Sequence, residues 1–177
     1  MYLCDTCRHV SESRDNVVNS IKVSVSEQRL SLLDEEGREL QQYPVSTSKY
    51  GTGNRNGSEQ TPLGLHRIKD KLGGAMPVNE VFIERVPHGN LEECQQRGVD
   101  LPDDVIMSRI MWLEGMEPGR NQGGYVDTYQ RYIYIHGTNH EDSIGTPASI
   151  GCSATFSPSL SPDNTTCELL LMLPRRI

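Results

Sequence analysis

The segment RYIYIHGTNHEDSIGTPASIGC, residues 131–152, places a histidine after a run of aromatic and aliphatic residues and a cysteine at the end of a glycine-containing loop. A cysteine attacks a carbonyl as the thiolate, so it needs a neighbouring base or a positive charge that lowers its pKa. His136 is the candidate base and Cys152 the candidate nucleophile. Backbone N–H groups near Gly151 and Cys152 could stabilise an oxyanion. The competing interpretation is an ordinary strand and loop that happen to contain both residue types.

The remaining cysteines do not form a pattern that indicates chemistry. Cys4 and Cys7 form a CxxC pair near His9, but no second pair follows at the spacing of a zinc ribbon. Five cysteines at irregular spacing are also a poor disulfide framework. Cys94 lies in the polar stretch NLEECQQRG, so we expect it to be exposed and incidental. We therefore expect no metal site and no cofactor.

Composition narrows the classes of protein to consider. A chain of 177 residues is long enough for one domain with a full core. The net charge of −7 argues against a general nucleic-acid binder. No apolar run approaches the roughly 18 residues of a membrane helix. Residues 1–19 are polar and contain no hydrophobic signal-peptide core, which taken alone indicates a cytoplasmic protein, or a chain whose signal was removed or whose N-terminus was mis-called.

Alternating apolar residues predict antiparallel strands along most of the chain. Ile21, Val23 and Val25 alternate with polar residues, and the pattern resumes at Leu30 and Leu32 before turn residues. Further strands are expected within residues 40–45, 65–72, 80–86, 105–115 and 131–137, with a loop at 48–64 and a loop or short helix at 89–104. The sequence therefore predicts a mainly β domain with few short helices. A parallel βαβ architecture is disfavoured because crossover helices are missing.

Four segments together resemble the L,D-transpeptidase catalytic domain, also called the YkuD-type domain. The first two are His136-Gly137-Thr138 at the end of a strand and Ser149-Ile150-Gly151-Cys152 in the loop that follows. The others are Tyr43–Thr47, which reads Tyr-Pro-Val-Ser-Thr, and the Thr-Pro-x-Gly segment at residues 61–64. The resemblance covers residues 21–152, most of the chain.

This resemblance implies a β-sandwich-like fold with a Cys-His site in a cleft. Family members cleave the L-to-D amide of a peptidoglycan tetrapeptide stem through an acyl-enzyme, which a stem amine or water resolves. Carried over, Cys152 is the nucleophile, His136 is the base and later the acid, and the Gly137 carbonyl fixes the imidazole tautomer. Ser149, Gly151 and Thr138 would bind substrate, form the oxyanion hole or support the loop.

The resemblance also implies partners and a compartment. Peptidoglycan stem peptides are the expected partners, and carbapenem β-lactams are the expected inhibitors because they acylate the cysteine of family enzymes. The family works outside the inner membrane, in the periplasm or cell wall. Neither nucleic acid, nor an integral membrane segment, nor an organic cofactor or metal is implied.

The segment after the cysteine departs from the family pattern. We divide the chain into a polar N-terminal segment (1–19), a catalytic domain (20–152) and an atypical tail (153–177). Relatives carry an arginine just after the cysteine, then a helix and a last strand, whereas this chain continues with Ser153, Ala154 and Thr155 and then several prolines. We expect a weak catalyst whose sheet keeps an exposed edge. A frameshift would explain the departure, and the nucleotide sequence across codon 152 checks it.

Three functions therefore remain open at the level of the sequence. The first is an active L,D-transpeptidase. The second is a catalytically degraded peptidoglycan-binding domain of the same family. The third is another Cys-His hydrolase, such as a peptidase of all-L peptides.

Overall fold

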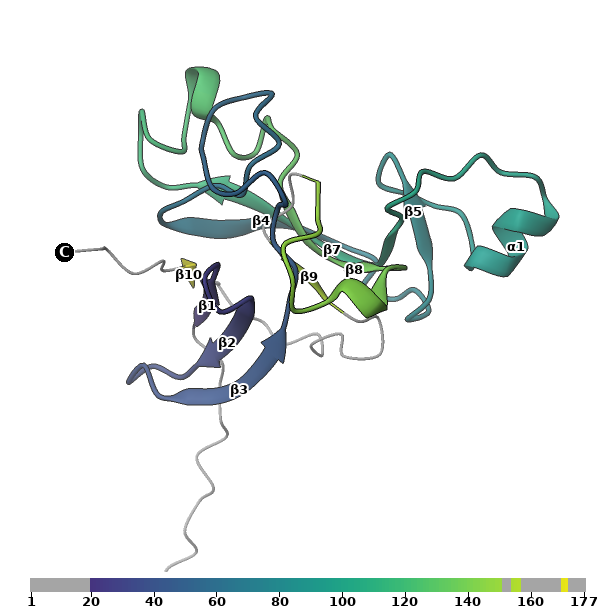
Figure 1. The fold of residues 1–177 in the computed structure, drawn as a ribbon, viewed down its shortest axis with the longest axis horizontal. Coiled ribbons are helices and arrows are strands. Elements are labelled where there is room, and N and C mark those ends of the chain that lie inside the picture. Colours follow the sequence, from purple (N-terminus) through teal and green to yellow (C-terminus); the bar gives the residue numbers. More distant parts are fainter. Residues whose placement is uncertain (1–19, 151–153, 157–169, 172–177) are drawn as a thin grey trace, which may run out of the picture.

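The structure is a computed structural model that describes residues 20–150, 154–156 and 170–171 (Figure 1). In these residues the chain forms ten strands, one α-helix and two short 3-10 turns. The strands are β1 (Ser20–Ser24), β2 (Arg29–Leu33), β3 (Glu39–Pro44), β4 (His66–Leu72), β5 (Val81–Ile83), β6 (Val86–Pro87), β7 (Ile106–Gly115), β8 (Tyr134–Thr138), β9 (Ala154–Phe156) and β10 (Leu170–Leu171). The helix is α1 (Leu91–Gln96), and the 3-10 turns are η1 (Gly124–Val126) and η2 (Glu141–Ser143). The predicted mainly β class with few short helices is confirmed.

Hydrogen-bonded pairs connect all of these strands into one sheet. Its main path runs β3-β2-β1-β10-β4-β7-β5-β6, and β8 pairs with β7 and β9. The long strand β7 is the central element, because β4, β5 and β8 all pair antiparallel with it. The strand that carries His136 is thereby attached directly to the middle of the sheet.

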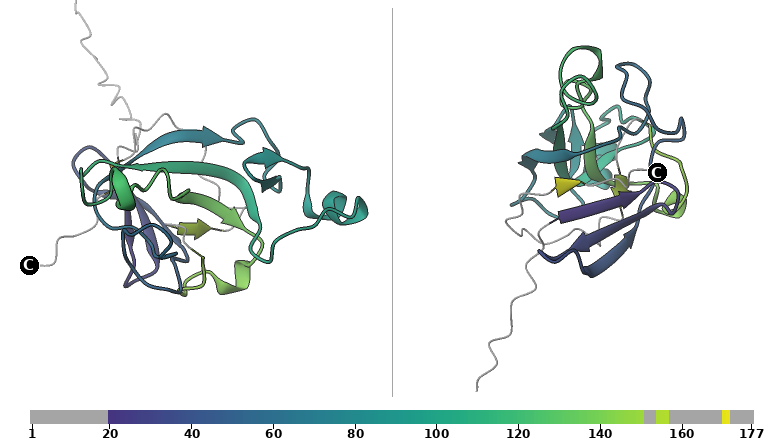
Figure 2. Two further views of the ribbon diagram at one scale, coloured as in Figure 1. Left: turned by 90° about the horizontal axis from the view of Figure 1, so that it is seen from above. Right: turned by 90° about the vertical axis from the view of Figure 1, so that its left-hand side faces the viewer.

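The sheet bends so that β1–β3 face β4, β7 and β8 across the main core, as the two views of Figure 2 show. Ile21 and Val23 alternate with exposed or half-buried neighbours on β1, as the period-two pattern predicts. The buried aliphatic residues between the two layers are Ile21, Val23, Leu30, Leu32, Val45, Leu113, Ile133 and Ile135. Burial of each such side chain contributes about 1.5–3 kcal/mol of transfer free energy. This layered arrangement agrees with the expected sandwich-like architecture.

Two short strands, β9 and β10, lie in the tail beyond the cysteine. β9 pairs with β8, and β10 lies between β1 and β4. The pairs β8·β9 and β1·β10 are parallel, whereas the sequence predicted only antiparallel neighbours. Parallel neighbours need a connection of a dozen or more residues. Residues 139–153 make that connection between β8 and β9, and the candidate nucleophile is near its end.

Helix α1 corrects the expectation for Cys94. Asn90 caps the helix and forms a reciprocal capping box with Glu93, so a helix begins within a stretch of mostly polar residues. Leu91 and Cys94 then lie three residues apart on one face. Cys94 is fully buried against Val81, Val105 and Met107, in a small core away from β1–β3 (Figure 1). The thiol is a packing residue and not an exposed one.

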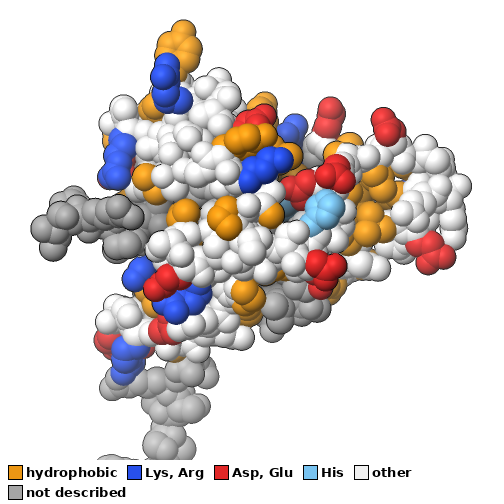
Figure 3. Space-filling view, in the orientation of Figure 1, with side chains coloured by type: hydrophobic (Ala, Val, Ile, Leu, Met, Phe, Trp, Pro, Cys, Tyr) orange, Lys and Arg blue, Asp and Glu red, His pale blue; other side chains and the backbone are white. Residues whose placement is uncertain are grey.

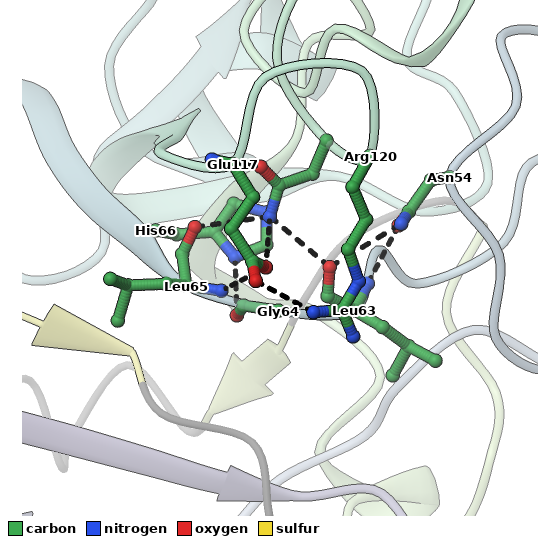
Figure 4. Close-up of polar contacts among 8 residues, drawn as sticks. Asn54, Leu63, Gly64, Leu65, His66, Glu117 and Arg120 are labelled. Carbon is green, nitrogen blue, oxygen red and sulfur yellow. Dashed lines mark hydrogen bonds and ion pairs between the residues drawn. The ribbon is translucent and has the colours of Figure 1, made fainter. Parts of the chain in front are cut away.

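A polar cluster fixes the residues before β4 against the turn after β7 (Figure 4). The Glu117 carboxylate accepts a hydrogen bond from Leu65 N at 2.9 Å and pairs with Arg120 at 2.7 Å. The fully buried Asn121 donates to the carbonyls of Leu63 and Leu65 at 3.2 and 3.0 Å. The end of the Thr-Pro-x-Gly segment is therefore held by side chains from about 55 residues further along the chain.

His66 belongs to the same cluster and is almost completely buried. Its Nδ1 lies 3.0 Å from the Gly64 carbonyl, and its Nε2 lies 3.0 Å from the Thr128 hydroxyl. Burial disfavours the charged ring and lowers the pKa of His66 to about 4. His66 is therefore a neutral structural residue near neutral pH.

This pKa predicts a pH-dependent stability. In the unfolded chain His66 takes up a proton near pH 6.5, whereas the folded chain resists protonation until about pH 4. Stability should therefore be fully present above pH 6.5 and fall by about 3 kcal/mol as the pH drops to 4. Denaturant unfolding at several pH values measures it. His66→Gln should be less stable at pH 7, but its free energy of unfolding should change less with pH between pH 6.5 and 5. An unchanged pH dependence in that range would contradict the buried, neutral state of His66.

Candidate active site

The strand β8 holds His136 in the interior of the protein. All five residues of β8 are buried, and His136 lies opposite Ile110 of β7. The strand ends with His136, Gly137 and Thr138, and it begins at Tyr134, three residues later than expected. Its Nδ1 lies 2.7 Å from the Gly137 carbonyl oxygen. Because a carbonyl oxygen only accepts, Nδ1 carries the hydrogen of this contact, which fixes the orientation of the ring.

Gly137 allows β8 to approach an irregular part of β7. The pairing register shifts between Met107 and Ile110, and Ser108 has a φ of 65° at this bulge. A Cβ on Gly137 would lie 2.8 Å from the Met107 carbonyl oxygen and 3.1 Å from Ser108 Oγ. Glycine is therefore required here by a close approach to backbone, and this approach fixes the carbonyl that binds His136.

Thr138 connects the end of β8 to the residues before β7. Its hydroxyl donates to Asp104 Oδ1 at 3.2 Å and accepts from the backbone N–H of His140 at 3.1 Å. Beside it, Asn139 Oδ1 accepts from Val105 N at 2.8 Å. These contacts fit the predicted role of Thr138 in supporting the loop.

The loop after β8 (residues 139–150) runs along the segment that follows β3. We call residues 45–49 the anchor segment; they include the end of the Tyr-Pro-Val-Ser-Thr segment. The contacts are Gly145 N to Val45 O (3.2 Å), Ser149 N to Thr47 O (3.1 Å), Lys49 N to Ser149 O (3.0 Å) and Ser46 Oγ to Ser143 O (2.8 Å). Two segments separated by about 100 residues are thus held together just before Gly151 and Cys152.

The Ser149 side chain has an unusual environment. Its residue is 3% exposed, yet its Oγ has no hydrogen-bond partner in the described part of the chain. Burial of a hydroxyl without a partner costs about 1–3 kcal/mol, so such groups are uncommon in folded proteins. Ser149 is therefore one of the few buried polar side chains of the described residues whose oxygen is not satisfied within the fold.

A pocket of about 190 Å³ opens next to this loop. Its lining includes Thr138, Ser149, Lys49, Asp104 and His140. The exposed His140 ring is held by Asp103, with Nε2 at 2.7 Å from the backbone carbonyl and 3.9 Å from the carboxylate. Figure 3 shows a histidine with acidic side chains beside it on this face of the molecule. The pocket thus offers hydroxyls, one ammonium group and carboxylates.

The structure describes four of the six predicted site residues, and it places Thr138 and Ser149 in the lining of one pocket. His136, Gly137 and Thr138 are consecutive on β8, and Ser149 lies in the loop after it. Gly151 and Cys152 lie outside the described residues, as do Cys4, Cys7 and His9. In the described ranges no three His, Cys, Asp or Glu side chains converge as a metal site would require. No helix found there has the length and apolar character to cross a bilayer.

Sequence reasoning missed several residues at the site. Lys49 and Asp104 line the pocket, and the buried Gln28 contacts the anchor segment. Lys49 and Asp104 lie in polar loops, where a charged residue gives no signal. Gln28 sits in the turn between β1 and β2, where a polar residue is ordinary. Only its burial and its partners in the folded chain distinguish it.

Comparison with known proteins gives one family. A family model, the L,D-transpeptidase catalytic domain (YkuD), matches residues 19–159. The search of curated proteins found no match. Among solved structures, an LD transpeptidase in complex with imipenem is 18% identical, with a TM-score of 0.42, covering 78% of this chain and 49% of its own.

Two further solved structures match at similar levels. An L,D-transpeptidase from Mycobacterium smegmatis is 14% identical, with a TM-score of 0.47, covering 88% of this chain and 58% of its own. The catalytic domain of an Enterococcus faecium L,D-transpeptidase is 13% identical, with a TM-score of 0.40, covering 85% of this chain and 95% of its own. The chain thus spans about half the length of the imipenem complex and somewhat more of the mycobacterial protein.

The close approach at Gly137 makes a direct prediction. Gly137→Ala should destabilise the protein by about 1–3 kcal/mol, because the new methyl group meets backbone that cannot rotate away. It should also shift the imidazole NMR signals of His136, since the neighbouring carbonyl must move. Ile135→Val, one residue earlier on β8, is the control and should cost about 0.5–1.5 kcal/mol without that shift. Equal stability loss and equal spectra in the two variants would contradict the steric argument.

Proposed function

The chain belongs to the L,D-transpeptidase catalytic domain family, and from this premise we propose that it is a cysteine-dependent acyltransferase of peptidoglycan. The proposed substrate is a tetrapeptide stem whose L-to-D amide is cleaved. A stem amine or water then takes the acyl group. The proposed site of action is the periplasm or cell wall, where the family substrate lies.

One observation carries this proposal. His136 is fully buried on a strand, and its Nδ1 hydrogen is committed to the Gly137 carbonyl. This hydrogen bond orients the ring so that Nε2 is the nitrogen assigned as the general base, because the ring cannot turn to present Nδ1 without losing that bond. The strand leads directly into the loop that carries Cys152. A buried histidine with one oriented nitrogen supports catalysis more than a purely structural role.

The proposed reaction has two halves. His136 Nε2 takes the proton of the Cys152 thiol, and the thiolate attacks the carbonyl carbon of the stem amide to form a C–S bond. The C–N bond then breaks, the departing nitrogen receives the proton from the imidazolium, and the terminal D-amino acid leaves. In the second half an amine or water loses a proton to His136 and attacks the thioester, and the thiolate departs.

The remaining site residues have supporting roles in this proposal. Backbone N–H groups at Gly151 and Cys152 would bind the oxyanion of each tetrahedral intermediate. The buried Ser149 hydroxyl lies in the same loop and would donate to the substrate. The Gly137 carbonyl holds the imidazole in one tautomer, the part that a carboxylate plays in other triads. The Thr138 contacts hold the start of the loop.

The nucleophile is tested by mass spectrometry after incubation with a carbapenem. The protein should gain the mass of one carbapenem, and Cys152→Ala should gain none, because no other group attacks the lactam carbonyl. Cys94→Ala is the matched control and should be acylated at the parent rate. Acylation of Cys152→Ala, or turnover of ordinary all-L peptides, would contradict the assignment.

The base is tested with two histidine variants. His136→Gln should lower the acylation rate constant by about 10²–10⁴-fold, the range for a positioned general base. His140→Ala should change it far less, because His140 is exposed and held by Asp103. Stopped-flow acylation kinetics measure both. A large loss in His140→Ala with little loss in His136→Gln would reassign the base.

A further inference from the structure

Gln28 is a buried polar residue in the hairpin turn between β1 and β2, far in sequence from the candidate active site. It is 6% exposed and has a φ of 49°, so the chain holds it in the left-handed region. This conformation is uncommon for a residue with a side chain, and it is retained where surrounding contacts determine it. The hydrogen bonds of Gln28 therefore indicate which part of the structure holds the turn in this conformation.

Every polar group of the Gln28 side chain is used. Nε2 donates to the Val25 carbonyl at 2.6 Å and to the Thr47 hydroxyl at 2.8 Å. Oε1 accepts from Thr47 N at 2.8 Å. In addition, the Gln28 backbone carbonyl accepts from Val45 N at 2.9 Å. Three of these four hydrogen bonds go to the anchor segment, and both partners of the amide–Thr47 pair are buried.

The anchor segment passes this constraint to the loop after β8. The carbonyl of Thr47 accepts from Ser149 N, and the carbonyl of Val45 accepts from Gly145 N. Gln28 thus holds the N–H groups of the same two residues whose carbonyls hold the loop. The N–H and the carbonyl of one residue lie in two rigid peptide planes that meet at its Cα, so a displacement of the N–H side of Val45 or Thr47 also moves the plane that carries its carbonyl.

We propose that Gln28 is a positioning residue. Through Val45 and Thr47, it sets the place of the loop after β8, which leads to Cys152, relative to His136. The inference rests on the proposed function for its catalytic consequence. Its structural content, the coupling of Gln28 to the loop, stands on the hydrogen bonds alone. Gln28 acts without touching substrate, and a misplacement of the thiol by about 1 Å is enough to lower a rate by 10²-fold.

The test compares Gln28→Met with Leu30→Ala. Methionine keeps the length and packing of Gln28 but removes its hydrogen bonds, whereas Leu30→Ala destabilises the same hairpin through the core. Both are measured at a temperature where each is fully folded. Gln28→Met should acylate about 10–100-fold more slowly with a carbapenem, and Leu30→Ala should remain within about threefold of the parent. Equal rates in the two variants would overturn the proposal.

A double-mutant cycle separates positioning from general destabilisation. Thr47→Val removes the hydroxyl that Gln28 binds, and Thr47→Ser keeps it. If Gln28 acts through Thr47, the double variant Gln28→Met/Thr47→Val should be no slower than the slower single variant, and Thr47→Ser should keep the parent rate. Rate losses that multiply would show independent effects and overturn the coupling. Gln28→Glu, which keeps the Oε1 acceptor, replaces Gln28→Met if the latter does not fold.

Amide hydrogen exchange tests the coupling without any enzyme activity. The amides of Gly145, Lys49 and Ser149 should exchange about tenfold faster in Gln28→Met than in Leu30→Ala, because their partners are no longer fixed. Unchanged exchange at these amides would overturn the positioning role. If the two variants show this difference in exchange but the carbapenem does not acylate the parent protein, the proposed function is refuted and the coupling of Gln28 to the loop stands.

Discussion

The backbone hydrogen bonds between the anchor segment and the loop after β8 are the contacts on which the candidate site depends. They join residues from the first third of the chain to residues from the last third. Ordering one backbone residue costs about 1–2 kcal/mol of conformational entropy. A loop from 139 to 150 would therefore sample many positions without such contacts, and the thiol that follows it would seldom meet the imidazole.

The other half of the site depends on a different kind of constraint. His136 lies on a buried strand, paired with β7 through a bulge whose backbone leaves no room for a side chain at Gly137. The proposed base is therefore fixed by a ladder of the central sheet, whereas the loop that leads to the proposed nucleophile is held by hydrogen bonds to the anchor segment. Both attachments reach the same core, because Val45 and Ile135 pack in one cluster.

Much of this arrangement could be predicted from the sequence, for physical reasons. The alternation at Ile21 and Val23 predicts one buried face, and the aromatic and β-branched residues before His136 predict the strand that carries it. The parallel pairs of β9 and β10 could not be predicted, because two or three residues carry no periodic pattern. Burial of Cys94 was missed because a capping box, and not apolar content, begins its helix. The partners of Gln28 and His66 are fixed only by tertiary contact.

The buried polar residues around Glu117 and around Thr47 have the same structural role. Around Glu117 and around Thr47, side chains bind the backbone of irregular segments that have no strand partner. A buried loop must satisfy its N–H and C=O groups, and only side chains from elsewhere in the fold are available to do so. A domain that presents its chemistry on loops therefore needs buried Gln, Asn, His and Glu residues beneath them. Their position shows which loops must hold still, and here the most constrained loop residues are those that precede Cys152.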